Sequence, residues 1–299
     1  MSTPSAAQHD DAGSHPDEKG GGRGGRPGRV VRSPLGWMLT GMAGVGVVSA
    51  LTATGPGPVP ALGAVAAVAV YGVVMRRVAG RSVPEAARLG SGREALRGGA
   101  LGLGFVLVST LLIAAFGGYS FSWAGNGFFS VTLSAAMVQA GAAVTEELMF
   151  RGFALQALEQ LWGSRAALVI TGLFFGVAHL GAPGASAWSS LAIAVEAGVM
   201  LGAAFLWRRS IWFVVGLHFA WNAAEQLLGI PVSGQTPQGM FTVVTHGSAL
   251  LNGGAFGLET SIVPILISVL LTVPMLVLAG RNGGLRPRRP GLGSFGRTG

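Results

Sequence analysis

The residues best suited to chemistry form a short charged group inside an apolar stretch. Glu146 and Glu147 interrupt an otherwise apolar run from Phe128 to Gly152, in which Arg151 stands four residues after Glu147. Charged groups at such a depth in a membrane are costly unless they are paired or hydrated, so a functional site is the default interpretation. On a helix, Glu147 and Arg151 share a face and can neutralise each other. Glu146 then lies about 100° around the helix and is free for another role.

Further polar side chains occur in later apolar runs: His179, Glu196, His218, Asn222 and Glu225. Glu146 precedes Gly163 by 17 residues and His179 follows it by 16. If the chain turns back at Gly163, both side chains lie about 25 Å from the turn and can face each other. His218 and Asn222 are spaced i, i+4, so they share a helix face and can border the same cavity.

A glutamate, two histidines and an amide around one cavity are suited to hydrolysis. A carboxylate and an imidazole can hold and deprotonate a water molecule. An imidazole and an amide can donate hydrogen bonds to the oxyanion that forms when this water attacks a carbonyl. Alternatively, Glu146, His179 and His218 could hold one zinc ion that activates the water. The His-Glu-x-x-His pattern of soluble zinc proteases is absent, so spacing alone does not favour a metal.

The composition identifies the solvent around these residues. Half of the residues are hydrophobic and 11% are charged, and the mean hydropathy is +0.57. A water-soluble domain needs far more surface charge, so the chain is predicted to be a polytopic membrane protein. It has no cysteine, which excludes disulfides, thiolate metal ligands and a cysteine nucleophile.

Apolar runs close to the length of a membrane span predict an all-α fold of about eight transmembrane helices, with the active site buried in the helix bundle. The runs are 36–54, 60–75, 98–116, 128–158, 165–180, 188–207, 211–228 and 259–279.

The positive charges support this count. With eight spans, all 20 Lys and Arg residues lie on one side of the membrane or, for Arg151, in the half of a helix nearest to it. The opposite loops, 55–59, 118–127, 181–187 and 229–258, contain no Lys or Arg. The positive-inside rule makes the arginine-rich side cytoplasmic, so we expect a multi-pass protein of the cell (inner) membrane with both termini in the cytoplasm. The Arg clusters are interpreted as topology signals and contacts to anionic lipid, and no nucleic-acid partner is expected.

These patterns divide the chain into six parts, and the site is expected to open toward the cytoplasm. The parts are a disordered cytoplasmic tail (1–33), helices 1 to 3 (34–127), a catalytic core of helices 4 to 7 (128–230), an extracytoplasmic loop (231–258), helix 8 (259–280) and a basic cytoplasmic tail (281–299).

Three motifs in order carry a resemblance to a known family. Glu146–Arg151 (EELMFR) resembles the Glu-Glu-x-x-x-Arg motif of the CPBP intramembrane proteases, also called the Abi or type II CAAX prenyl endopeptidase family. Phe175–His179 (FGVAH) is similar to the family's Phe-x-x-x-His motif, and His218–Asn222 (HFAWN) is similar to its His-x-x-x-Asn motif. The resemblance covers about 130–228.

The resemblance implies an intramembrane endopeptidase in which Glu146 and His179 activate the water and His218 and Asn222 stabilise the oxyanion. The second carboxylate and the arginine would support the site. Metal-dependent and metal-free glutamate mechanisms have both been proposed for such proteases, so a zinc cofactor is left open. The implied partners are membrane lipid and a membrane-associated or lipidated peptide substrate.

Two other functions compete with proteolysis. A proton-coupled transporter would use the same acidic and imidazole groups as a relay, but it predicts inverted repeats, and the sequence shows no internal repeat. A non-catalytic scaffold or a bacteriocin-immunity-type protein is the other alternative. Glu196 and Glu225 match no motif and are expected to have structural or hydration roles.

Overall fold

Apolar helices built from the predicted runs make up most of the structure, a computed structural model that describes residues 30–87 and 89–288. The predicted tails 1–33 and 281–299 lie largely outside these residues. The longer helices are α2 (Pro34–Thr52), α3 (Val59–Val73), α4 (Ser91–Ala115), α5 (Phe128–Glu147), α6 (Leu155–Ala178), α9 (Ile211–Leu228) and α11 (Ile262–Arg281). The shorter ones are α7 (Ala187–Ile193), α8 (Leu201–Arg208) and α10 (Ala249–Asn252).

Irregular helical turns join several of these helices. The π-helical segments are η1 (Val74–Val78), η3 (Leu148–Ala154) and η5 (Ala194–Met200). The 3₁₀ turns are η2 (Pro84–Ala86), η4 (His179–Gly181) and η6 (Leu258–Thr260). π-Helical turns are rare in proteins, and those that occur often lie at functional sites. The segment η3 directly follows Glu146 and Glu147, so its position agrees with a functional site there.

The prediction of an all-α polytopic membrane protein is confirmed. Six helices of the described chain are long and apolar enough to cross a membrane. One of them, Phe128–Gly181, has 54 residues, which at about 1.5 Å each would far exceed the ~30 Å of hydrocarbon. Gly163 interrupts it with a non-helical conformation (φ 81°, ψ 167°), so it comprises two helical arms. α9 is not among the six, because His218 and other polar residues lower its hydropathy. If the two arms are counted as separate helices and α9 is added to the six, the total is the eight helices predicted. That all eight cross the membrane stays a prediction.

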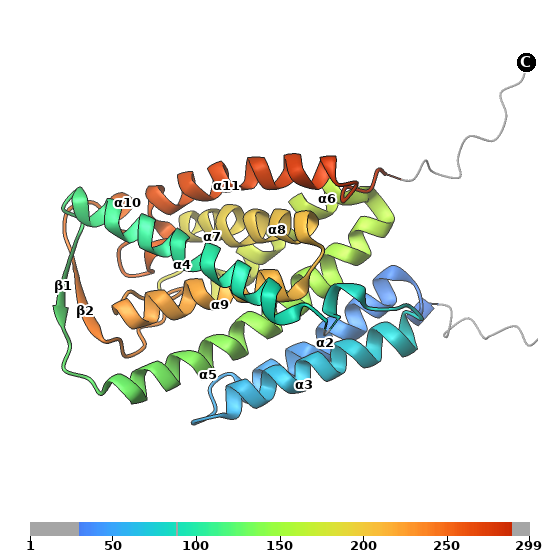
Figure 1. The fold of residues 1–299 in the computed structure, drawn as a ribbon, viewed down its shortest axis with the longest axis horizontal. Helices are drawn as coiled ribbons and strands as arrows, with labels where there is room; N and C mark the ends of the chain where they lie inside the picture. The colour runs from blue at the N-terminus through green and yellow to red at the C-terminus, as the bar shows by residue number, and fades with distance from the viewer. Residues whose placement is uncertain (1–29, 88, 289–299) are drawn as a thin grey trace, which may run out of the picture.

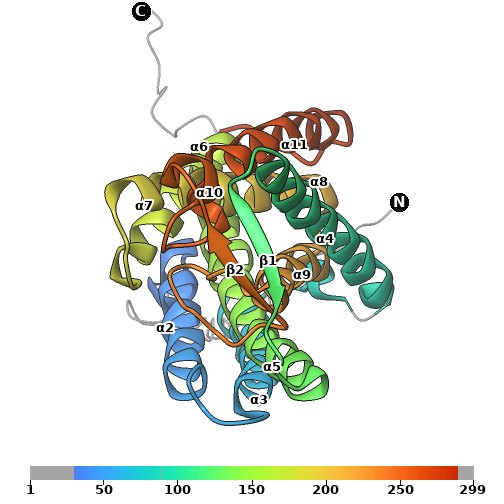
Figure 2. The same cartoon turned by 90° about the vertical axis from the view of Figure 1, so that its left-hand side faces the viewer.

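The loops of the two predicted sides lie at opposite ends of the bundle. Figure 1 shows the turn of α6 and the C-terminal end of α11 at one end. The start of α5, α10 and two short strands lie at the other. The strands β1 (Tyr119–Trp123) and β2 (Phe241–Thr245) pair antiparallel, with Tyr119 opposite Thr245. This ribbon lies across the end of the bundle (Figure 2). This ribbon was not predicted, since each strand is a short segment within a loop.

α9, which carries two of the predicted site residues, packs closely on α4 through glycines. A Cβ atom added at Gly102 would lie 2.2 Å from the backbone oxygen of Leu217, and one at Gly98 would lie 1.9 Å from that of Phe213. From the other side, a Cβ at Gly216 would lie 2.1 Å from the backbone oxygen of Ala95. The absence of side chains at these positions therefore sets the separation of the two helices, as in other small-residue membrane interfaces.

We expect Gly102→Ala to destabilise the protein by about 1–3 kcal/mol, because α4 and α9 must separate to admit the methyl group. Gly104→Ala is the matched control, since a Cβ on that glycine of the same helix meets no atom within 4 Å. Both changes bring the same gain in helix propensity. Thermal unfolding in detergent compares the two variants, and equal midpoints would contradict the packing argument.

Candidate active site

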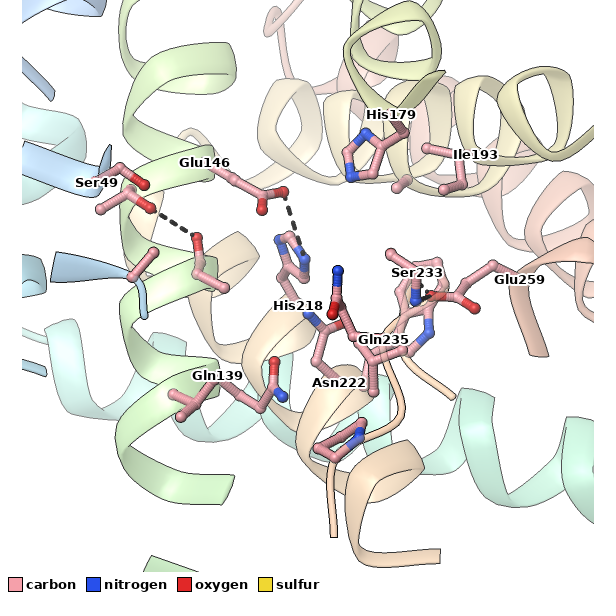
Figure 3. Close-up of a pocket in the computed structure, with 18 of the residues that line it drawn as sticks. Ser49, Gln139, Glu146, His179, Ile193, His218, Asn222, Ser233, Gln235 and Glu259 are labelled. Atoms are coloured by element: carbon pink, nitrogen blue, oxygen red, sulfur yellow. Dashed lines mark hydrogen bonds and ion pairs between the residues drawn. The ribbon is translucent and has the colours of Figure 1, made fainter. Parts of the chain in front are cut away.

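All four residues predicted to do chemistry line one cavity of about 540 Å³. Glu146 comes from α5, His179 from the end of α6, and His218 and Asn222 from α9. Figure 3 shows their side chains around a common space. The depth estimate that placed Glu146 opposite His179 is consistent with this arrangement, because the two arms on either side of Gly163 bring both residues to the same cavity.

The ion pair predicted from the i, i+4 spacing is present in the wall behind the cavity. Arg151 Nη1 lies 2.9 Å from Glu147 Oε1, and the two side chains are 2% and 0% exposed. Arg151 Nη2 also donates to the backbone oxygens of Ala197 and Gly198 in the π-helical segment η5. The guanidinium thus joins η3 to η5, because its Nη1 binds the carboxylate and its Nη2 donates to carbonyl groups, as is typical of a buried charge.

Glu147 has a second partner that no sequence pattern indicated. His218 Nδ1 lies 2.8 Å from Glu147 Oε1, although the two residues are 71 positions apart. Glu147 therefore binds α9 as well as its own helix. His218 Nε2 lies 4.0 Å from Glu146 Oε2, which is too long for a direct hydrogen bond. Each glutamate of the pair thus faces one nitrogen of the same imidazole.

His179 has one nitrogen engaged and one available. Its Nδ1 lies 2.8 Å from the backbone oxygen of Phe175, and its ring stacks on the Phe175 ring with 4.7 Å between centroids. A carbonyl only accepts hydrogen bonds, so Nδ1 carries the proton. In this neutral tautomer Nε2 has a lone pair and can accept a hydrogen bond from a molecule in the cavity.

Asn222 lies one helical turn after His218 and is 8% exposed. Its carboxamide has no hydrogen-bond partner among the residues that the structure describes. Since buried amides are normally satisfied, this group is suited to a partner that enters the cavity.

The cavity extends toward the end of the bundle whose loops lack Lys and Arg. Its lining on α5 runs from Val138 to Glu146, and it includes Thr54 after α2 and the loop residues 232–237 after α9. On the opposite side of Glu146 the chain packs around Arg151. The lining thus extends away from the arginine-rich end, and the predicted opening toward the cytoplasm stays a prediction.

Glu196 and Glu225 do not line this cavity. Both are fully buried, and Glu225 Oε1 accepts a hydrogen bond of 2.9 Å from the indole nitrogen of Trp221. Trp221 is a cavity-lining residue, so Glu225 fixes part of the wall. This agrees with the structural role expected for Glu225.

The donor set predicted for zinc does not form a metal site. No group of three or more His, Cys, Asp or Glu side chains within 30–87 and 89–288 is arranged to hold a metal ion. Glu146, His179 and His218 share the cavity, yet their arrangement does not fit a metal ion that needs at least three protein ligands at about 2 Å.

We expect Arg151→Met to destabilise the protein by about 3–5 kcal/mol, because Glu147 would keep its buried charge without the guanidinium. The double variant Glu147→Leu/Arg151→Met should recover most of this loss, since it removes both charges together. Arg97→Met is the control, because Arg97 is 62% exposed in its pair with Glu94 and such pairs contribute at most about 1 kcal/mol. Denaturant unfolding in detergent measures all three. A double variant no more stable than Arg151→Met would contradict the charge argument.

Comparisons with known proteins agree with the motifs. Residues 128–224 match the family described as type II CAAX prenyl endopeptidase Rce1-like. No curated protein matches the chain, and no solved structure matches it. The matched residues include Glu146, His179, His218 and Asn222. The resemblance predicted from the three motifs is therefore confirmed, and over residues 128–224 this membrane protein carries the Rce1-like type II CAAX prenyl endopeptidase pattern.

Proposed function

We propose that the protein is an intramembrane endopeptidase that hydrolyses a peptide bond of a membrane-associated or lipidated peptide. One observation carries the proposal: a single cavity gathers two acceptors for a water molecule, Glu146 and His179, and two groups that can donate to an oxyanion, His218 and Asn222. Proteolysis is also the activity of the matched family. Cell-membrane localisation with both termini in the cytoplasm is part of the same proposal, on the strength of the charge pattern.

Glu146 and His179 are suited to activating the water. The Glu146 side chain is 27% exposed, and Nε2 of His179 carries a lone pair because its Nδ1 donates to Phe175. A water molecule donates one hydrogen to each acceptor, and the Glu146 carboxylate takes a proton as the water oxygen attacks the substrate carbonyl. The same carboxyl group then returns the proton to the leaving amine, so the C–N bond breaks with all atoms balanced.

His218 and Asn222 are suited to stabilising the oxyanion formed in this attack. With Nδ1 held by Glu147, His218 presents Nε2 to the cavity, where the imidazolium form donates a hydrogen bond. The two glutamates and Arg151 have a net charge of −1, and an imidazolium at His218 balances it. The Asn222 amide adds a neutral donor one turn further along α9. Preorganised donors of this kind are usually the largest contribution to catalysis of acyl transfer.

Glu146→Gln should lower proteolysis by about 10²–10⁴-fold, because the amide cannot accept the proton. His179→Gln should lower it as well. His246→Gln is the control, because His246 does not line the cavity. Its ring nitrogen Nε2 is hydrogen-bonded to the hydroxyl of Ser120 in strand β1. Mass spectrometry of peptide termini in membranes with wild type or variant is the measurement. If wild type and Glu146→Gln produce the same termini, the proposal is refuted.

Chelators should leave the activity unchanged, because the cavity's donor set does not fit a metal ion. The test incubates the purified protein with 1,10-phenanthroline or EDTA and measures the rate of appearance of the same peptide terminus. Loss of activity that added zinc restores would establish a metal-dependent mechanism instead.

A further inference from the structure

Gln235 is a polar side chain of the cavity that the mechanism above does not use. Gln235 lies in the loop after α9 and lines the cavity with Glu146, His218 and Asn222. Figure 3 shows its side chain extending from the loop into the cavity. Its carboxamide has no hydrogen-bond partner among the described residues, and the residue is exposed. An unpaired amide with this placement is available to a molecule that occupies the cavity.

A tight turn holds Gln235 in place. Val232 and Gln235 exchange backbone hydrogen bonds of 2.8 and 2.9 Å. Between them, Ser233 (φ 46°) and Gly234 (φ 79°) have positive φ angles. Two consecutive positive φ values are typical of a type I′ turn, the tight turn of β-hairpins. The backbone that leads into Gln235 and the backbone groups of Gln235 itself are therefore held in place.

The turn is anchored to other parts of the bundle. Glu259, which is 3% exposed, accepts hydrogen bonds from Ser233 N at 2.8 Å and Ser233 Oγ at 3.1 Å. Gly234 N donates to the backbone oxygen of Phe256 at 2.7 Å. A Cβ atom at Gly234 would lie 2.0 Å from the backbone oxygen of Pro183, so the turn also packs on the loop after η4. These contacts make the turn a rigid support, as precise substrate binding requires.

We propose that Gln235 binds the main chain of the peptide substrate beside the bond that is cleaved. A carboxamide has one carbonyl acceptor and an NH₂ donor, so it can pair with the N–H and C=O groups of an extended peptide. Gln235 is then a substrate-binding residue that sets which peptide bond lies against Glu146. The inference rests on the proposed endopeptidase function. It adds that the loop containing Gln235 determines the position in which the peptide binds along the cavity.

The test uses Gln235→Leu, which keeps the bulk of the side chain and removes its hydrogen bonds. With a synthetic peptide spanning the cleavage site found in wild-type membranes, KM should rise about five- to tenfold, the loss expected for one or two hydrogen bonds. The kcat value should stay within about twofold of wild type, because the interaction is made with the bound peptide as well as the transition state. Gln238→Leu is the matched control, since Gln238 lies in the same loop and does not line the cavity.

Ester-substituted peptides distinguish substrate binding from a structural role. Replacing one main-chain N–H near the cleaved bond with oxygen should weaken binding to the wild type and have no further effect on Gln235→Leu. Equal sensitivity of both proteins at every position would overturn the inference. So would an unchanged KM in Gln235→Leu, while loss of activity in Glu146→Gln would still support the endopeptidase function. If Glu146→Gln stays fully active, the proposed function fails and this inference fails with it.

Discussion

A buried carboxylate that must be paired controls the arrangement of this site. Glu147 is fully enclosed, so its charge is tolerated only because Arg151 and His218 contact the same oxygen, at 2.9 and 2.8 Å. Removing Arg151 would leave the Glu147 carboxylate without its guanidinium in an apolar bundle, and removing His218 would take away its hydrogen bond to α9. This requirement joins α5 to α9 and, through Arg151, to η5. The side chains that face the substrate are thus positioned by a residue that the substrate does not touch.

The same requirement explains irregular features of the helices. η3 follows Glu147 directly and contains Arg151, and η5 supplies the carbonyl groups that Arg151 binds. π turns of this kind are frequently found at functional sites. α9 has a polar face with His218 and Asn222, and the close glycine contacts with α4 keep that face turned to the cavity. Its reduced hydropathy follows from the polar groups that the site needs.

The fold and the main site residues could be predicted from sequence because they depend on local spacing and depth. The helical runs, the Glu147–Arg151 pair and the facing of Glu146 and His179 across Gly163 all follow from helix geometry. The Glu147–His218 bond could not be predicted, since it depends on how α9 is rotated against α5. The ribbon and the Val232–Gln235 turn were missed because their short strands are stabilised by long-range contacts, such as Ser233 with Glu259.

The cavity therefore has two kinds of wall, and their chemistry suits different tasks. The helical wall contains Glu146, His179 and His218, whose precise placement requires rigid elements and buried partners. The loop wall around Gln235 is free of Lys and Arg and offers an amide and backbone groups, and the neighbouring carboxylate of Glu259 is bound by Ser233. Neutral groups of this kind can bind a peptide main chain without disturbing the charge balance of Glu146, Glu147, Arg151 and His218. A charged residue at the position of Gln235 would add an unbalanced charge to the same cavity, which is a physical reason for an amide at this place.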